Sequence, residues 1–249
     1  IEGVNAGDQS GWSVSLSGDG TIVAIGAPSK YPYTATNKGY VRMYKRDVSN
    51  TTIDPVGWTQ LGANIDGQAV GDKSGGSVSL SIDGKTVAIG ATSNDDNGAL
   101  SGHVRVYEWD NADDTWDQLG QDIKGENSYD YSGYSVSLSD DGRTVAIGAI
   151  YYDGNGDNNS GHVRVYEWDN ADDSWLQLPE DIIGMNPDDY SGRSVSLSSD
   201  GRTLAIGAPN NGSGRVRVYD LIDTTWSEIG VIEGVNAGDQ SGWSVSLSG

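Results

Sequence analysis

Residues 135–149 read SVSLSDDGRTVAIGA, and this stretch decides the fold. Residues 135–139 alternate small polar with apolar side chains, which is the pattern of a half-buried strand. Asp141-Gly142 then marks a hairpin turn, because such turns need a positive φ that glycine adopts freely. Residues 144–149 are almost continuously apolar and predict a second strand, buried on both faces.

The same stretch returns along the chain. The tetrapeptide SVSL begins at Ser13, Ser77, Ser135, Ser194 and Ser244, at intervals of 64, 58, 59 and 50 residues. In the third unit, two further strands are predicted at residues 162–166 and 175–178. Four antiparallel strands in about 58 residues make one propeller blade. We therefore predict an all-β fold, a β-propeller of four four-stranded antiparallel blades (1–64, 65–122, 123–181 and 182–231), with an extra first-strand segment at 232–249.

Three kinds of residue recur at fixed places in the units. The last strand carries a tryptophan that we interpret as packing between blades: Trp58, Trp116, Trp175 and Trp226. The third strand carries an arginine: Arg42, Arg105, Arg164 and Arg217. The opening segment carries an aspartate: Asp8, Asp72, Asp130 and Asp189. The last two sets predict charge-assisted bridges between neighbouring strands or blades, with a ring of charges lining a channel as the alternative.

The units resemble the FG-GAP repeats that build the propeller of integrin α chains. The segments that carry the resemblance are residues 10–14 (SGWSV) and 26–28 (GAP), with their counterparts at 132–136, 148–150, 191–195 and 207–209. The resemblance implies a propeller that serves in adhesion, recognition or surface architecture. Two features depart from the family: serine replaces the phenylalanine before glycine, and a tight hairpin replaces the usual calcium loop.

Calcium is the one ion that the sequence suggests, at another position. The loop at 153–160 places oxygen-bearing side chains at alternating positions between glycines, a pattern that can fold around Ca²⁺. The predicted ligands are Asp153, Asn155 and Asp157, and a solvated loop is the alternative. No cofactor is expected to be required.

Composition restricts the partners. With 36 acidic and 15 basic residues the formal net charge is −21, which opposes binding to nucleic acid and to anionic membranes. The sequence has no cysteine and no apolar run long enough to span a membrane, so neither disulfides nor membrane insertion are expected.

His103 and His162 hold the same place in the second and third units, just ahead of a strand. We interpret them as polar residues at a strand edge, because no acid–base partner recurs beside them. The chain contains no nucleophile elbow, metal-hydrolase helix or phosphate loop. No catalytic residue is therefore predicted, and the chain is not expected to be an enzyme.

The predicted loops carry possible sites of modification and contact. Glycosylation sequons begin at Asn50, Asn158 and Asn211. Tyrosines in the same loops could stack on sugars or proteins: Tyr31, Tyr33, Tyr151 and Tyr152. Glycans and surface proteins are therefore possible partners.

Residues 1–18 and 232–249 are identical, although the units themselves have diverged. Either a parent protein repeats a 231-residue block in tandem, or the chain was built with an overlap. The first reading predicts copies of itself or adjacent tandem blocks as partners. It favours a non-enzymatic, extracellular or cell-surface protein of structural or adhesive function, such as a fibre, stalk or adhesin. The alternative is a lectin-like or receptor-like ligand-binding propeller, with or without a dependence on calcium.

Overall fold

The computed structural model describes residues 1–3, 5–29, 37–52, 56–154 and 158–248. Within these ranges the chain forms strands, turns and bends, and no α-helix. Sheet one holds β1 (Ser13–Leu16), β2 (Ile22–Ala27), β3 (Tyr40–Arg46), β4 (Trp58–Gln60) and β5 (Ile65–Asp66). Sheet two holds β6 (Ser74–Leu80), β7 (Thr86–Ala91), β8 (His103–Asp110), β9 (Thr115–Gln118) and β10 (Ile123–Lys124).

The second half of the chain repeats this arrangement. Sheet three holds β11 (Ser135–Leu138), β12 (Thr144–Ala149), β13 (His162–Asp169), β14 (Ser174–Gln177) and β15 (Ile182–Ile183). Sheet four holds β16 (Ser194–Leu197), β17 (Thr203–Ala208), β18 (Arg215–Ile222) and β19 (Thr225–Glu233). All strand pairs within these sheets are antiparallel, so the predicted all-β propeller fold is confirmed.

The hairpin that decides the fold forms as its sequence predicts. In sheet three, β11 pairs with β12 in a register that places Ser135 opposite Gly148. Between them Gly142 adopts φ 68°, and Oδ1 of Asp141 accepts a hydrogen bond from the Arg143 amide at 2.9 Å. The strand that follows the turn is buried almost throughout, because both of its faces are covered.

Three sheets contain one short strand more than the four predicted. Ile65, Ile123 and Ile182 are the first residues of units two to four. Each begins a two-residue strand that pairs with the third strand of the sheet formed by the unit before it. In sheet four the long strand β19 performs this role, since Ile232 lies opposite Val216. The opening residues of units two to four, and residues 232–233, therefore belong to the sheet that the unit before them forms.

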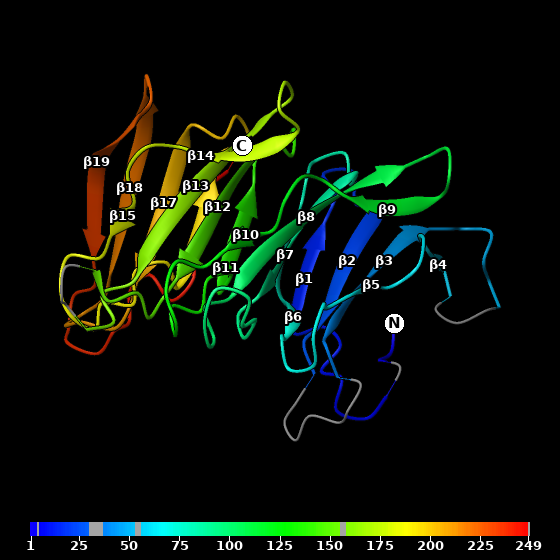
Figure 1. The fold of residues 1–249 in the computed structure, drawn as a ribbon, viewed down its shortest axis with the longest axis horizontal. Coiled ribbons are helices and arrows are strands. Elements are labelled where there is room, and N and C mark those ends of the chain that lie inside the picture. The colour runs from blue at the N-terminus through cyan, green and yellow to red at the C-terminus, as the bar shows by residue number, and fades with distance from the viewer. Residues whose placement is uncertain (4, 30–36, 53–55, 155–157, 249) are drawn as a thin grey trace.

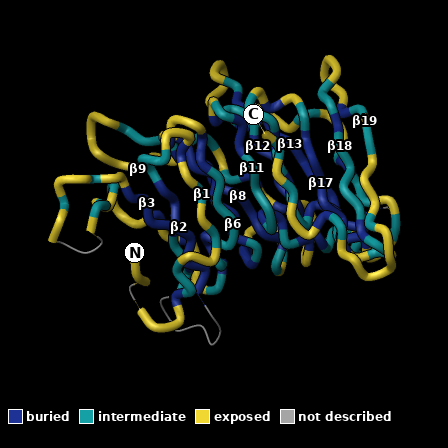
Figure 2. The backbone as a smooth tube through the Cα atoms, turned by 180° about the vertical axis from the view of Figure 1, so that it is seen from behind, coloured by how far each residue is buried: buried dark blue, intermediate teal, exposed yellow. Residues whose placement is uncertain are grey.

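The apolar core lies in layers between neighbouring sheets. One cluster joins Val104 and Val106 of sheet two to Val145, Ile147 and Trp175 of sheet three. As the sequence predicts, the tryptophan packs between blades: its Nε1 donates to the Leu119 carbonyl of the preceding unit at 2.9 Å. Figure 2 shows the buried residues running along the sheets and the exposed ones concentrated in the connecting loops.

The first strands of the sheets also lie against one another at close range. Ser135 Oγ donates to the Gly192 carbonyl at 2.7 Å, and the Leu197 amide donates to Ser137 Oγ at 3.0 Å. A Cβ on Gly148 would lie 2.1 Å from the Gly192 oxygen, so only glycine allows this approach. The four sheets follow one another in a row, with β4 and β19 at opposite ends (Figure 1). No helix in the described residues is long and apolar enough to cross a membrane.

Candidate metal centre

Two histidines are buried at equivalent places in neighbouring sheets. His103 begins β8 and His162 begins β13, and both side chains are 0% exposed. Neither ring nitrogen of either histidine has a hydrogen-bond partner among the described residues. A buried polar group without a partner costs about 1–3 kcal/mol, so two such residues one repeat apart need an explanation. Both histidines lie at the first position of their strands, in line with the sequence interpretation, and they are buried because the opening loop of the following unit covers them.

Backbone contacts hold the opening loop of the following unit over each histidine. Gly102 and Gly161, which precede the two histidines, have φ values of 74° and 70°. Each forms a parallel bridge with a serine of the following unit, Ser132 or Ser191. The histidine side chains are therefore enclosed between their own sheet and the next opening segment.

An aspartate from the end of the same unit faces each imidazole. In sheet three, Nδ1 of His162 lies 3.6 Å from Oδ2 of Asp181. The other oxygen of Asp181 accepts a hydrogen bond from Gln177 Nε2 at 2.7 Å. This amide orients the carboxylate in the way that outer residues orient metal ligands.

The equivalent carboxylate in sheet two is held in the same way. Gln118 Nε2 donates to Oδ1 of Asp122 and Gln68 Nε2 to Oδ2, both at 2.8 Å. Gln118 and Gln177 occupy equivalent positions, four residues before their aspartates. The repeat has therefore kept the histidine, the aspartate and the amide that positions it.

A second carboxylate completes each group. Asp96, from the loop between β7 and β8, joins His103 and Asp122, while Glu126 joins His162 and Asp181. In each group the three possible ligand atoms lie within 4.8 Å of one another. Asp96 and Glu126 are exposed, so both groups open to solvent on one side.

The electrostatics favour a neutral imidazole at His103 and ionised carboxylates at Asp122 and Asp181. Burial, followed by the Arg105 charge, lowers the pKa of His103. The His162 imidazole is the main cause of a lowered pKa at Asp181. Burial opposes ionisation of Asp122, but the hydrogen bonds from Gln68 and Gln118 outweigh it and its pKa is also lowered. A neutral imidazole and carboxylates are the forms that bind metals.

Each of the two exposed carboxylates lies near one cationic side chain. Lys124 Nζ lies 3.5 Å from Oδ2 of Asp96, and both side chains are more than 40% exposed. Arg164 Nη1 lies 3.8 Å from Oε1 of Glu126. The pair of Lys124 with Asp96 is exposed, and such pairs contribute about 0–1 kcal/mol, so a divalent cation can displace it. Arg164 is buried, so its pair with Glu126 is not of this exposed kind.

The first and fourth sheets lack the histidine of this group. Tyr40 replaces the histidine in unit one, and its hydroxyl donates to Asp8 at 2.8 Å. Arg215 replaces it in unit four, where Nη1 lies 3.4 Å from the Met185 sulfur. Only the two central positions combine imidazole and carboxylate.

An aromatic ring covers one of the histidines. Tyr152 stacks on His162 with the ring centroids 3.9 Å apart and an interplanar angle of 13°. Tyr151 packs edge-on against Tyr131 and Tyr190, with centroids 5.1 and 5.2 Å away. The two described loop tyrosines therefore contact other rings of the chain; Tyr31 and Tyr33 lie outside the described residues.

The arginine and aspartate sets lie where the repeat predicts but are not paired with each other. The arginines donate to backbone carbonyls of the segment that opens their unit: Arg105 to Asp66 at 2.7 Å, Arg164 to Lys124 at 2.7 Å, Arg217 to Ile183 at 2.9 Å, and Arg42 to Glu2. Since these segments pair with the preceding sheet in units two to four, the arginines there connect neighbouring sheets. None of the ion pairs among the described residues joins one of these arginines to one of the aspartates.

The aspartates close their own loops. Asp8, Asp72, Asp130 and Asp189 are all buried, and each accepts a backbone amide from a residue three positions earlier, at 2.8–3.0 Å. Burial raises the pKa of Asp130. Their role is therefore to hold the turn that leads into each first strand.

The predicted calcium loop is described in part. Asp153 is exposed, and its Oδ1 accepts the Asn159 amide at 2.7 Å. Asn155 and Asp157 lie outside the described residues, so calcium at this loop stays a prediction. Among the sequons, Asn158 is exposed, whereas the side-chain amides of Asn50 and Asn211 donate to the carbonyls of Trp58 (3.0 Å) and Pro187 (3.4 Å).

Residues 124–166 match the sequence model of the FG-GAP repeat. The predicted resemblance is confirmed. This match covers the opening segment and first three strands of the third unit, the part that contains His162, Arg164 and Gly148. No curated protein matches the chain.

Solved structures share the fold at low identity. A periplasmic gluconolactonase from Pseudomonas aeruginosa is 16% identical, with a TM-score of 0.59, over 91% of this chain and 58% of its own. A putative 6-phosphogluconolactonase from Bacteroides fragilis is 12% identical, with a TM-score of 0.58, over 90% and 55%. One from Bacteroides uniformis is 12% identical, with a TM-score of 0.50, over 90% and 72%. The chain thus spans under two thirds of the first two of these propellers.

These neighbours correct the predicted function. The chain was expected to be a non-enzymatic structural or adhesive protein, yet the three solved structures compared above are described as lactonases, which are enzymes. The physical reason is that the repeat pattern reports how blades pack, and blades pack alike in adhesive and enzymatic propellers. The expectation that the chain is not an enzyme therefore gains no support from its fold.

Proposed function

We propose that the chain is a β-propeller that binds a divalent transition-metal ion, such as Zn²⁺, at each of its two histidine sites. The observation that carries the proposal is the pair of fully buried imidazoles, each with unpartnered nitrogens and each facing carboxylates. Metal coordination would satisfy one ring nitrogen of each histidine, Nδ1 in His162, and so explain why the repeat keeps them.

The ligand types favour this class of metal. Imidazole nitrogen with carboxylate oxygen suits Zn²⁺ and its neighbours in the first transition row. Ca²⁺ prefers six to eight oxygen ligands, which these groups do not supply. Bonds of about 2.0–2.2 Å require ligand atoms closer than 4.8 Å, and rotation of the exposed Asp96 or Glu126 side chain can bring them together.

A thermal-shift experiment tests the proposal. Zn²⁺ should raise the melting temperature of the chain, because an ion that binds only the folded state stabilises it. The shift should shrink in Asp122→Asn and in Asp181→Asn, and vanish in the double variant. Asp153→Asn is the matched control, since it removes a loop carboxylate outside both sites. An equal Zn²⁺ shift in the double variant and the control would refute metal binding at these positions.

Hydrolysis of a cyclic sugar ester is the second candidate function. Two observations favour it: two of the solved structures that share the fold are described as lactonases, and each proposed site is open to solvent beside its exposed carboxylate. A bound Zn²⁺ lowers the pKa of a coordinated water and so supplies a nucleophile. Hydrolysis of δ-lactones by the Zn²⁺-loaded chain should disappear in the double variant; unchanged hydrolysis would remove this second function and leave the first.

We further propose a location outside the cytoplasm, extracellular or at the cell surface. The support is the description of one neighbour as periplasmic. Fractionation of source cells tests it: recovery of the chain with the cytoplasmic proteins would contradict the location and leave metal binding untouched.

A further inference from the structure

Sheet one has an apolar face that is covered in every other sheet. Leu16 is 55% exposed and Ile1 is 44% exposed. Their equivalents in units two to four are 8% exposed or less, because a preceding sheet covers them: Leu80, Leu138, Leu197, Ile65, Ile123 and Ile182. Trp12 and Val14 on the same segment are 65% and 58% exposed.

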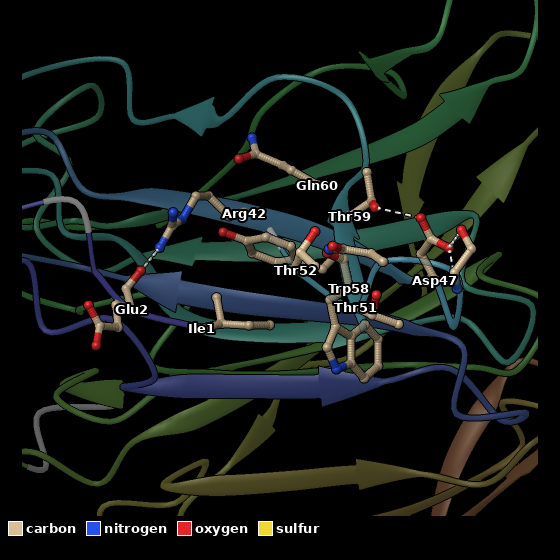
Figure 3. Close-up of a pocket in the computed structure, with 12 residues that line it drawn as sticks. Ile1, Glu2, Arg42, Asp47, Thr51, Thr52, Trp58, Thr59 and Gln60 are labelled. Atoms are coloured by element: carbon tan, nitrogen blue, oxygen red, sulfur yellow. Dashed lines mark hydrogen bonds between the residues drawn. The ribbon is translucent and has the colours of Figure 1, made fainter. Parts of the chain in front are cut away.

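The apolar layer behind this face contains residues of sheet one alone, whereas the layers between sheets contain residues of two sheets. Val23, Ile25 and Tyr44 form a small cluster of their own with Trp58. In the next layer, the equivalent residues of sheet two pack on Ala24, Val41 and Met43 of sheet one. A hollow of about 780 Å³ lies at this end, lined by residues that include Ile1, Arg42, Tyr44 and Trp58 (Figure 3).

The opposite end of the molecule shows which surface binds the opening segment of sheet one. Residues 232–249 repeat the sequence of residues 1–18, and Gly242 and Leu247 of this segment contact sheet four. Ser194 Oγ donates to the Gly242 carbonyl at 2.9 Å, and the Leu247 amide donates to Ser196 Oγ at 2.9 Å. The Arg193 guanidinium lies 3.9 Å from the centre of the Trp243 ring.

These contacts match the junctions between the sheets. Ser13 donates to the Gly75 carbonyl at 2.8 Å and Ser77 to the Gly133 carbonyl at 2.7 Å, as Ser194 does to Gly242. Ser241 also bridges Gly214, as Ser74 bridges Gly39. Sheet four thus already holds the opening segment of a further unit, and that segment has the sequence of sheet one's own opening.

We propose that two copies of this chain associate head to tail, with sheet one of one copy docked on sheet four of the other. Residues 1–18 of the incoming copy take the place of residues 232–249. Ile1 and Glu2 pair with Val216 and Arg215 of β18, where Ile232 and Glu233 pair within one chain. This interface does not depend on metal binding.

The exchange has a clear driving force. The eighteen residues that leave and the eighteen that replace them are identical, so their contacts with sheet four cancel. What remains is the burial of side chains on sheet four that a complete further sheet would cover: Val216 and Val218 of β18 are half-buried, whereas their equivalents Val163 and Val165 of β13 are fully buried. Covering this apolar surface favours association. Sheets one and four lie at opposite ends of the molecule, so the contact forms between copies (Figure 1). It is heterologous, because the two faces differ.

The duplication supplies a matched test, because one substitution can be made at two identical positions. Leu16→Glu places a charge on the docking face, whereas Leu247→Glu weakens the segment that competes for sheet four. Sedimentation velocity over a concentration series should show that the unmodified chain associates. Leu16→Glu should remain monomeric, and Leu247→Glu should associate at least as strongly as the unmodified chain. A monomeric unmodified chain, or equal association of the two variants, would overturn the proposal.

A crosslinking measurement covers the case in which a glutamate disturbs folding. The chain has no cysteine, so introduced thiols are unique. The single variants Leu16→Cys and Ser196→Cys are mixed and oxidised, because in each junction this leucine lies against this serine. The mixed disulfide should exceed either homodimer on a non-reducing gel. A statistical mixture of dimers would contradict the head-to-tail interface.

Discussion

Nδ1 of His162 and Oδ2 of Asp181 face each other across 3.6 Å inside sheet three. Asp122 and His103 repeat the relationship one unit earlier. The distance is too long for a hydrogen bond and short enough for two ligands of one metal ion. A metal ion bound between the two side chains would therefore coordinate both of them.

The first prediction concerns the free-energy cost of burying imidazole nitrogens that have no hydrogen-bond partner. His162→Phe should leave the stability of the metal-free protein unchanged or higher, because an apolar ring no longer buries unpaired nitrogens. Unit one already carries an aromatic ring, Tyr40, at this position. Chemical denaturation with a chelator present measures the effect. A loss of several kcal/mol would show that the imidazole has a structural partner.

The second prediction concerns the glycine of the Gly-Ala motif. Gly148→Ala should destabilise the chain strongly, because the new Cβ would lie 2.1 Å from the Gly192 oxygen. Gly230→Ala is the control: no atom lies within 4 Å of its Cβ, so it should stabilise by about 0.5–1 kcal/mol. Melting temperatures that move in the same direction would contradict the close contact between sheets.

The third prediction concerns the tryptophan between blades. Trp175 is 2% exposed, so Trp175→Ala should cost about 3–5 kcal/mol. The adjacent Leu176 is 50% exposed, and Leu176→Ala should stay within about 0.5 kcal/mol. Urea denaturation of both variants tests the contrast. Similar midpoints would show that Trp175 does not hold sheets two and three together.

The fourth prediction concerns the repeated arginine. Arg105 donates to the Asp66 carbonyl and lies over the Tyr107 ring, with the guanidinium carbon 5.4 Å from the centroid. Arg105→Met should cost about 1–3 kcal/mol, because the Asp66 carbonyl loses the charged donor that the buried Arg105 supplies. An unchanged melting temperature would show that this contact between sheets is dispensable.

Much of the fold is predictable from the sequence because it repeats. Each Asp-Gly turn, apolar second strand and last-strand tryptophan has a local physical cause, and the structure contains all of them. The short strands that begin at Ile65, Ile123 and Ile182 were missed, because two residues carry no periodicity. Their pairing depends on the preceding sheet, which the local pattern does not describe.

Only part of the candidate site was predictable from the sequence. The recurrence of His103 and His162 is plain in the sequence, but their burial depends on the opening segment of the next unit. Asp122 and Asp181 also recur, one residue before an isoleucine that marks each unit. That shared spacing of nineteen residues was the available signal. Asp96 and Glu126 come from different loops, so no sequence pattern could relate them.

The stoichiometry of Zn²⁺ binding tests the central claim most directly. Isothermal titration calorimetry of the full chain should give two Zn²⁺ per chain, one in Asp122→Asn and one in Asp181→Asn, and none in the double variant. Ca²⁺ titrated under the same conditions should leave both histidine sites free to bind Zn²⁺. Absence of Zn²⁺ binding to the unmodified chain, or two ions still bound by the double variant, would contradict the account.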